Sequence, residues 1–271
     1  MAVEKMKYPL LLVHGMGFRD YEHIGYWGRI PKALEQLGCR VYFGGQDSNG
    51  TIETNGRHLA ERIDKILKET GAEKVNILAH SKGGLDSRYA ISSLGMGEKV
   101  ASVTTMATPH HGSKTVDKLL SFPNWMVRFV GWCADVWFYV MGDHHPNTYR
   151  VFHCFTTKGA AEFNANNPDH PDVYYQSYAF VMKKPLSDFL MWLPNTVVGW
   201  VEGPNDGLLP PEAVKWGEFR GVFTGAGRRG ISHCDEIDLR RRPLCRKGGE
   251  GVTDVTELYV EAVCNIIEKG F

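Results

Sequence analysis

Short apolar runs alternate with segments of helical periodicity through the first half of the chain. The run Leu10–Val13 has the continuous hydrophobic character of a strand buried on both faces. The predicted strands are Leu10–Val13, Cys39–Phe43, Lys74–Ala79 and Val100–Met106, and the predicted helices are Ile24–Leu37, Asn55–Thr70 and Gly83–Leu94. Strands that alternate with helices of this length pack as a parallel sheet with right-handed crossovers. The pattern therefore predicts the α/β class, with a mostly parallel central sheet flanked by helices.

The second half of the chain is less regular and contains a long apolar insert near residues 120–141. The other elements predicted there are strands at Val173–Val181, Thr196–Val201 and Phe219–Phe223 and a closing amphipathic helix at Val255–Ile267. A length of 271 residues is at the upper limit of what one hydrophobic core can organise. We therefore expect residues 1–271 to form a single domain, with a helical lid or cap inserted at approximately 113–157.

The charged side chains balance, because 31 Lys and Arg residues stand against 31 Asp and Glu residues. A nucleic-acid-binding protein normally has a basic excess, so the zero net charge argues against nucleic acid as a partner. We expect the basic run around Pro243 to be a solvated surface loop. That run contains Arg240, Arg241, Arg242, Arg246 and Lys247.

The cysteines and the N-terminus bear on the cellular compartment. The six cysteines are scattered and include no Cys-x-x-Cys pair, which favours free thiols over a disulfide framework or a zinc site. The segment Met1–Lys7 runs into the first strand without a signal-peptide pattern, and no uncharged apolar stretch is long enough for a membrane-spanning helix. We expect a cytoplasmic protein, or a secreted one if a signal peptide has been removed.

The strongest local signal is the run Ala79–Gly84, AHSKGG, between a predicted buried strand and a predicted helix. A serine on a sharp strand-to-helix turn requires small neighbours, because the backbone there is strained. Ala79 replaces the first glycine of the usual Gly-x-Ser-x-Gly pattern. We predict that Ser81 is a nucleophile at the helix N-terminus, where the dipole and free amides favour developing negative charge. The alternative is an ordinary serine N-cap.

A glycine-containing loop, residues 14–18 (HGMGF), follows the first strand directly. Acyl transfer requires two backbone N–H groups aimed at the oxyanion of the tetrahedral intermediate. We predict that these are the amides of Met16 in this loop and of Lys82, the residue after the nucleophile. Gly15 and Gly17 allow the loop to turn tightly. A merely flexible glycine-rich loop is the alternative.

An activated serine needs a base and an acid that orients the base, and the expected chain order is serine, acid, histidine. Asp206 follows a predicted strand at a turn and is the best downstream acid, with Glu202 and Asp188 as weaker rivals. His233 lies after the last predicted strand and before the last helix, which makes it the best base. The histidines between Ser81 and Asp206 break the chain order.

Together these segments resemble the bacterial true lipases, the triacylglycerol lipases of the α/β-hydrolase superfamily. The resemblance extends over nearly the whole chain and is densest at residues 8–116. It implies an α/β-hydrolase fold, with Ser81, Asp206 and His233 as the triad and the amides of Met16 and Lys82 as the oxyanion hole. The matching landmarks, in order, are Tyr8–Leu10, His14–Met16, Ala79–Gly84, Ala107–Gly112, Asn205–Gly207 and His233–Glu236.

The same resemblance bears on cofactors. Catalysis by such a triad requires no cofactor, and we predict no catalytic metal. Many members of the family bind a structural calcium near the catalytic histidine, and Asp235 matches one of its ligands. Asp188 lies near the position of a second ligand, and a later ligand position falls near Leu239. A structural calcium is therefore one expectation for this chain.

The apolar insert contains three of the seven tryptophans. Its apolar residues recur at three- and four-residue spacing in two neighbouring rows, as in a helix. We predict a lid that covers the acyl pocket in water and opens on an oil surface. The alternative is a helix buried against the sheet or in a dimer face. The residues assigned to the lid and to substrate binding are Trp125, Phe129, Trp132 and Trp137.

These features predict a serine carboxylic-ester hydrolase, with a lipase acting on medium- to long-chain acylglycerols as the first choice. Its expected partners are an ester or lipid substrate and, transiently, a lipid interface. One alternative is an esterase or polyester hydrolase with the same triad but without interfacial activation. Another is a non-catalytic α/β-hydrolase that binds an apolar ligand or partner. The oligomeric state is left open.

Overall fold

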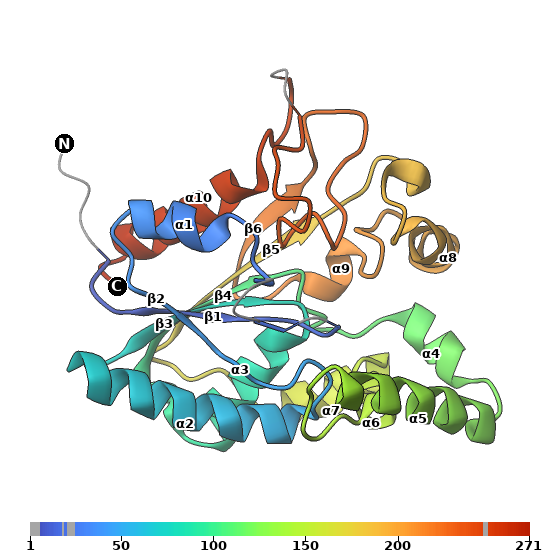
Figure 1. Cartoon of the computed structure of the whole chain (residues 1–271), viewed down its shortest axis with the longest axis horizontal. Coiled ribbons are helices and arrows are strands. Elements are labelled where there is room, and N and C mark those ends of the chain that lie inside the picture. The colour runs from blue at the N-terminus through green and yellow to red at the C-terminus, as the bar shows by residue number, and fades with distance from the viewer. Residues whose placement is uncertain (1–5, 18, 21–24, 246–248) are drawn as a thin grey trace.

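The computed structural model describes residues 6–17, 19–20, 25–245 and 249–271 (Figure 1). Within these residues, six strands form one parallel sheet in the order β2-β1-β3-β4-β5-β6. This sheet confirms the predicted α/β class. The strands are β1 (Leu10–Val13), β2 (Val41–Phe43), β3 (Val75–His80), β4 (Val100–Met106), β5 (Tyr174–Phe180) and β6 (Glu218–Phe223).

Helices cover both faces of the sheet. α1 (Ile30–Gln36) and α10 (Val255–Glu268) lie on one face, and α2 (Ile52–Thr70) and α3 (Lys82–Ser93) lie on the other (Figure 1). Successive residues of a strand point to opposite faces, so β1 contributes to two cores. Leu10 and Leu12 belong to the core under α1 and α10, and Leu11 and Val13 belong to the core under α2 and α3.

The remaining helices lie in the connections that lead to β4, β5 and β6, and α4, α5 and α8 extend beyond the edge of the sheet (Figure 1). No helix among the described residues is long and apolar enough to cross a membrane. The assignment of residues 1–271 to one domain, with a lid at 113–157, stays a prediction. These connecting elements are η1 (Met96–Lys99), α4 (Lys114–Leu120), α5 (Asn124–Val140), α6 (Thr148–Cys154), α7 (Thr157–Asn166), η2 (Pro185–Ser187), α8 (Trp192–Glu202) and α9 (Pro211–Val214).

The strand predicted at Thr196–Val201 is wrong, because this segment belongs to helix α8. Its β-branched residues favour a strand only weakly, and tertiary packing overrides such preferences. Asn195 and Val198 are buried one helical turn apart, while Trp200 is exposed. Only a helix places the first two on one face and the third on another.

The first predicted helix, Ile24–Leu37, is also shorter than expected. α1 begins at Ile30, with Pro31 in its first turn, where a missing N–H costs nothing. Five residues named in the sequence predictions lie outside the described residues: Met1, Phe18, Ile24, Arg246 and Lys247.

Candidate active site

Ser81 occupies the sharp turn between β3 and α3, as predicted. Its backbone is strained, with φ 52° and ψ −129°, and the turn is held by two hydrogen bonds. The amide of Ser81 donates to the carbonyl of Met106 over 2.8 Å, and Thr108 Oγ1 donates to the carbonyl of Ser81 over 2.7 Å. The Ser81 side chain makes no capping hydrogen bond to the helix. The arrangement therefore favours an exposed hydroxyl over the N-cap alternative.

The glycines around Ser81 are required by close approach. A Cβ atom at Gly83 would lie 2.5 Å from the carbonyl oxygens of Val13 and His14, because the first turn of α3 packs directly on the end of β1. A Cβ atom at Gly15 would lie 2.7 Å from Cβ of Ser81. The loop after β1 is thus packed directly against the Ser81 turn.

Buried polar contacts fix this loop. Gln46 Nε2 donates to the carbonyl of His14 over 2.9 Å, and the two His14 ring nitrogens lie 2.8 and 2.9 Å from the carbonyl oxygens of Gly15 and Gln46. Burial lowers the pKa of His14 to about 4, so its ring is neutral. The side chain of Lys82 is buried and forms an ion pair with Asp86 over 2.7 Å. The backbone amide of Lys82 lies in the first turn of α3, where N–H groups have no hydrogen-bond partner within the helix.

Asp206 and His233 are 27 residues apart in the sequence and are in contact in the structure. His233 Nδ1 lies 2.9 Å from Asp206 Oδ2, and the amide of His233 donates to the carbonyl of Asp206 over 2.8 Å. The other carboxylate oxygen accepts the amides of Leu208 and Leu209 at 2.7 and 2.8 Å. Burial by itself would raise the pKa of Asp206, but His233 and these two amides outweigh it and lower that pKa. The carboxylate is therefore ionised and fixed in direction.

Two further residues lie beside this pair, and neither received a role from the sequence. His80 Nε2 is 2.8 Å from Glu236 Oε2, and the same oxygen is 3.3 Å from His233 Nδ1. The ring of His80, the residue before Ser81, lies 4.5 Å from the ring of His233 between centroids. His80, His233 and Glu236 carry atom types that a metal can use, but these atoms already contact one another. The one signal in the sequence that pointed to Glu236 was its position three residues after His233.

The two rival acids have other partners. Glu202 Oε1 accepts hydrogen bonds from Ser113 Oγ and from the amide and hydroxyl of Thr115 at 2.6–2.9 Å, which ties the end of α8 to the start of α4. Asp188 accepts Ser232 Oγ over 2.7 Å and Arg240 Nη2 over 2.9 Å. Asp206 is therefore the acid among the three that His233 contacts.

The predicted calcium position does not fit these residues. Asp188 and Asp235 both face Arg240, whose Nη2 and Nε atoms lie 2.9 and 3.3 Å from the two carboxylates. The remaining oxygen of Asp188 accepts backbone amides, and that of Asp235 contacts Ser232 and Arg229. Calcium takes six to eight oxygen ligands, whereas here a guanidinium lies between the carboxylates. Arg240 is thus not part of a solvated basic loop, which corrects the sequence prediction.

The sequence of residues 8–180 matches the family described as "alpha/beta hydrolase fold". The chain belongs to the α/β-hydrolase family. Triacylglycerol lipase 2 of Saccharomyces cerevisiae is 29% identical to it over 266 residues, which cover 92% of this chain and 75% of that protein. The triacylglycerol lipase of Pseudomonas fragi is 30% identical over 200 residues, which cover 65% of this chain and 68% of that protein.

The crystal structure of Staphylococcus hyicus lipase has the same fold. It matches this α/β-hydrolase with a TM-score of 0.70 at 18% sequence identity, over 98% of each chain. The family match and the relatives together show that this α/β-hydrolase is a carboxylic ester hydrolase of the lipase and esterase kind.

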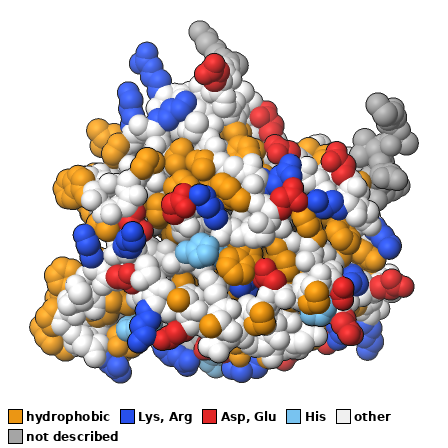
Figure 2. Space-filling view, turned by 180° about the vertical axis from the view of Figure 1, so that it is seen from behind, with side chains coloured by type: hydrophobic (Ala, Val, Ile, Leu, Met, Phe, Trp, Pro, Cys, Tyr) orange, Lys and Arg blue, Asp and Glu red, His pale blue; other side chains and the backbone are white. Residues whose placement is uncertain are grey.

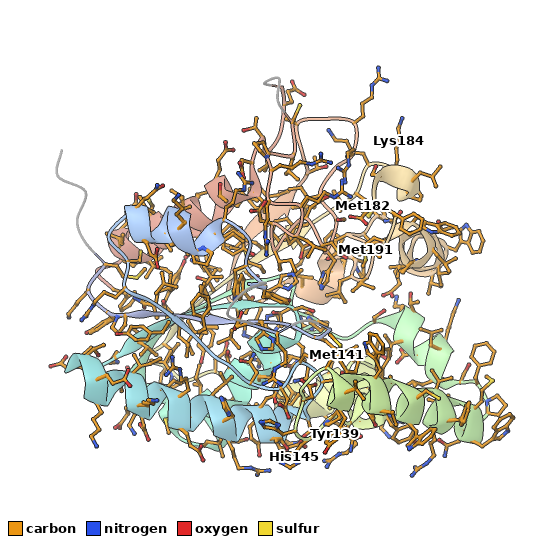
Figure 3. The ribbon with its side chains drawn as sticks, in the orientation of Figure 1. Tyr139, Met141, His145, Met182, Lys184 and Met191 are labelled. Atoms are coloured by element: carbon orange, nitrogen blue, oxygen red, sulfur yellow. The ribbon has the colours of Figure 1, made fainter. Side chains whose placement is uncertain are left out.

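The apolar insert of this hydrolase lies on the outside of the molecule. In α5, Trp125, Phe129, Trp132 and Trp137 are 58–73% exposed, and Gly131 is buried. The alternative of a helix buried against the sheet is therefore wrong. Hydrophobic side chains gather at one edge of the molecule, over α8 and over α5 (Figure 2). Met141 and Met191 lie at the inner ends of these two helices (Figure 3).

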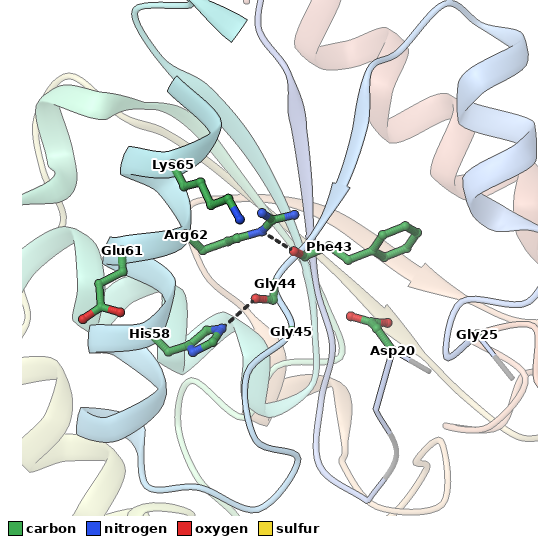
Figure 4. Close-up of a pocket in the computed structure, with 9 residues that line it drawn as sticks. All are labelled: Asp20, Gly25, Phe43, Gly44, Gly45, His58, Glu61, Arg62 and Lys65. Atoms are coloured by element: carbon green, nitrogen blue, oxygen red, sulfur yellow. Dashed lines mark hydrogen bonds between the residues drawn. The ribbon is translucent and has the colours of Figure 1, made fainter. Parts of the chain in front are cut away.

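Two cavities lie away from Ser81 and His233. A cavity of about 690 Å³ beside β2 and α2 is lined by charged side chains, Phe43 and glycines, with His58 and Arg62 donating to the carbonyls of Gly44 and Phe43 (Figure 4). An apolar cavity of about 240 Å³ lies between α4, α5 and α6. Neither is lined by the candidate catalytic residues, so the larger volume does not mark the reacting centre.

Proposed function

We propose that this α/β-hydrolase is a lipase that cleaves medium- to long-chain acylglycerols through a Ser81–His233–Asp206 triad. The observation that carries the proposal is the buried 2.9 Å contact between His233 and Asp206 beside the strained Ser81 turn. The names of the yeast and Pseudomonas fragi relatives, both triacylglycerol lipases, support the substrate class.

In this mechanism His233 Nε2 takes the proton of Ser81 as Ser81 Oγ bonds to the ester carbonyl carbon, while Asp206 holds the ring in the tautomer with the Nδ1 hydrogen. The amides of Met16 and Lys82 stabilise the oxyanion, each contributing about 3–4 kcal/mol. His233 then protonates the leaving alcohol as the C–O bond breaks. In the second half, His233 activates water, which releases the acid and restores Ser81. No cofactor takes part in these steps.

The exposed apolar side chains of α5 and α8 support a lipase over a simple esterase. Such surfaces are costly in water and are stabilised by contact with lipid. α4, α5 and α8 lie on the same flank of the molecule (Figure 1), and Glu202 joins the end of α8 to the start of α4. We expect α5 and α8 to contact the same interface. Since the chain has no net charge, this contact depends on apolar burial more than on attraction to anionic head groups.

We also infer that Arg240 provides the positive charge that a calcium ion would supply between Asp188 and Asp235. The guanidinium joins the segment before α8 to the loop that carries His233. On this inference neither catalysis nor the loop requires a metal.

Replacement of the nucleophile tests the triad. We expect Ser81→Ala to lower kcat for p-nitrophenyl butyrate by at least about 10³-fold, because no acyl-enzyme can form. Ser87→Ala is the matched control, since Ser87 is buried in the same helix and donates only to the carbonyl of Gly83. Equal activity of Ser81→Ala and the wild type would contradict the triad.

The substrate class is tested by comparing butyrate and palmitate esters below and above their solubility limits. A lipase should favour the palmitate ester and show a rise in rate when the ester forms an interface. Trp132→Ser combined with Trp137→Ser should remove most of this rise without changing the rate on dissolved butyrate, whereas Arg128→Ser in the same helix should not. A preference for short esters with no rise would instead indicate an esterase.

A further inference from the structure

A line of buried hydrogen bonds begins at the oxyanion loop. The amide of Gly15, next to Met16, donates to the hydroxyl of Tyr26 over 2.9 Å, and that hydroxyl lies 2.7 Å from His80 Nδ1. Because the hydroxyl accepts the Gly15 hydrogen, it is free to donate its own hydrogen to Nδ1. His80 therefore carries its proton on Nε2. Tyr26 and His80 are almost fully buried, so no water competes for these bonds.

The line continues to the catalytic base. His80 Nε2 donates to Glu236 Oε2 over 2.8 Å, and this oxygen also lies 3.3 Å from His233 Nδ1, the atom that is hydrogen-bonded to Asp206. Glu236 is completely buried, and its other oxygen, Oε1, has no hydrogen-bond partner within the described residues. Four hydrogen-bonding groups thus connect the loop that carries Met16 to the ring of His233.

We propose that Tyr26, His80 and Glu236 are positioning residues that hold the oxyanion loop and the His233 ring in one fixed arrangement. The inference rests on the proposed function and adds to it a physical link between the two parts of the site. The oxyanion donor and the base must both be correct to within a fraction of an ångström, and a shared network fixes one relative to the other.

The charge on Glu236 follows from its surroundings. Burial, together with the neighbouring Asp206 carboxylate, raises the pKa of Glu236 well above its usual value. Burial and the His233 ring lower the pKa of His80, so the surroundings of both residues favour their neutral forms. The titratable groups around Glu236 are Tyr26, His80, Asp206, His233, Cys234, Asp235 and, from α10, Tyr259.

Tyr26→Phe tests the link, because it removes one hydroxyl and two hydrogen bonds. We expect kcat on dissolved p-nitrophenyl butyrate to fall by about tenfold or more, with KM changed less than about twofold. Tyr178→Phe is the control, since Tyr178 is also buried and its hydroxyl accepts from Asn265, away from the oxyanion loop and His233. A loss in Tyr26→Phe no greater than in Tyr178→Phe would overturn the proposal, provided that thermal unfolding shows both variants to be folded.

Glu236 is tested by two substitutions. Glu236→Ala leaves His80 without an acceptor and should lower kcat by about tenfold or more. Glu236→Gln keeps both an acceptor oxygen and a neutral head group, so it should restore most of that loss and leave the acid limb of the kcat/KM pH profile in place. If Glu236→Gln is as slow as Glu236→Ala, or shifts that limb to lower pH, the neutral positioning role is wrong. A wild-type protein without ester hydrolysis would contradict the proposed function itself.

Discussion

At the scale of single residues, the site depends on how closely atoms can approach Ser81. Gly15 and Gly83 each leave room for a neighbouring backbone or side chain at less than 3 Å from where a Cβ atom would lie. Ala79, by contrast, fits where the common motif has glycine, because its methyl group is buried in the sheet core. Positions 15 and 83 therefore require glycine because neighbouring atoms occupy the space of a Cβ atom, and not because the backbone there must be flexible.

Gly15→Ala should lower kcat by roughly 10²-fold, because its Cβ would press on Ser81 and on the Tyr26 hydroxyl and displace the oxyanion loop. The measurement is kcat and KM on a dissolved ester. Gly25→Ala is the control, since a Cβ there meets nothing within 4 Å. Wild-type kcat in Gly15→Ala would show that the loop does not supply an oxyanion donor.

At the scale of elements, loops that follow different strands are joined by buried ion pairs. Arg240 connects Asp188, after β5, to Asp235, which lies two residues beyond His233. Glu202 connects α8 to α4 through hydrogen bonds from Ser113 and Thr115. These contacts hold the base and the apolar helices on a rigid sheet without covalent links.

Arg240→Met should destabilise the protein by about 3–5 kcal/mol, because it leaves the buried Asp188 carboxylate without its positive partner and Asp235 with only the longer contact to Arg229. For a chain of this size that loss lowers Tm by roughly 6–15 °C. Arg242→Met, at an exposed position of the same loop, should change Tm little. We also expect EDTA to leave the wild-type Tm unchanged, and a large drop in EDTA would contradict the role given to Arg240.

At the scale of the whole molecule, the interior holds several neutral histidines. His14, His80 and His110 are buried, and burial lowers the pKa of each, for His14 to about 4. In the unfolded chain each would take up a proton below about pH 6.5. The unfolded state therefore binds more protons in this range, and each histidine lowers the free energy of unfolding as pH falls from about 6.5 toward 4. Glu236, with its raised pKa, acts in the opposite direction and offsets part of the loss.

His110→Gln should reduce the pH dependence of stability between pH 5 and 6.5 by about 1.4 kcal/mol per pH unit, the contribution of one proton. Urea unfolding at several pH values measures this slope. His145→Gln, at an exposed position, should leave the slope as in the wild type. An unchanged slope in His110→Gln would show that His110 titrates normally in the folded protein.

The sequence by itself determined the parallel sheet of the first half and the identity of Ser81, Asp206 and His233 as candidates. Apolar runs report burial on both faces of a strand, and the strained serine turn and the chain order of the three residues are local properties. Residues 196–201 of α8 were predicted as a strand because their side chains are compatible with a helix or a strand, and the choice depends on the residues that they pack against.

Only the tertiary structure decided the partners of Glu236, Tyr26 and Arg240. The contact of His80 with Glu236 spans 156 residues, and that of Asp188 with Arg240 spans 52. A buried polar side chain must find a partner, but which one it finds depends on the strand order and on the loops that meet at the edge of the sheet. The local sequence pattern does not predict such long-range contacts, because they form only when the helices and strands pack together.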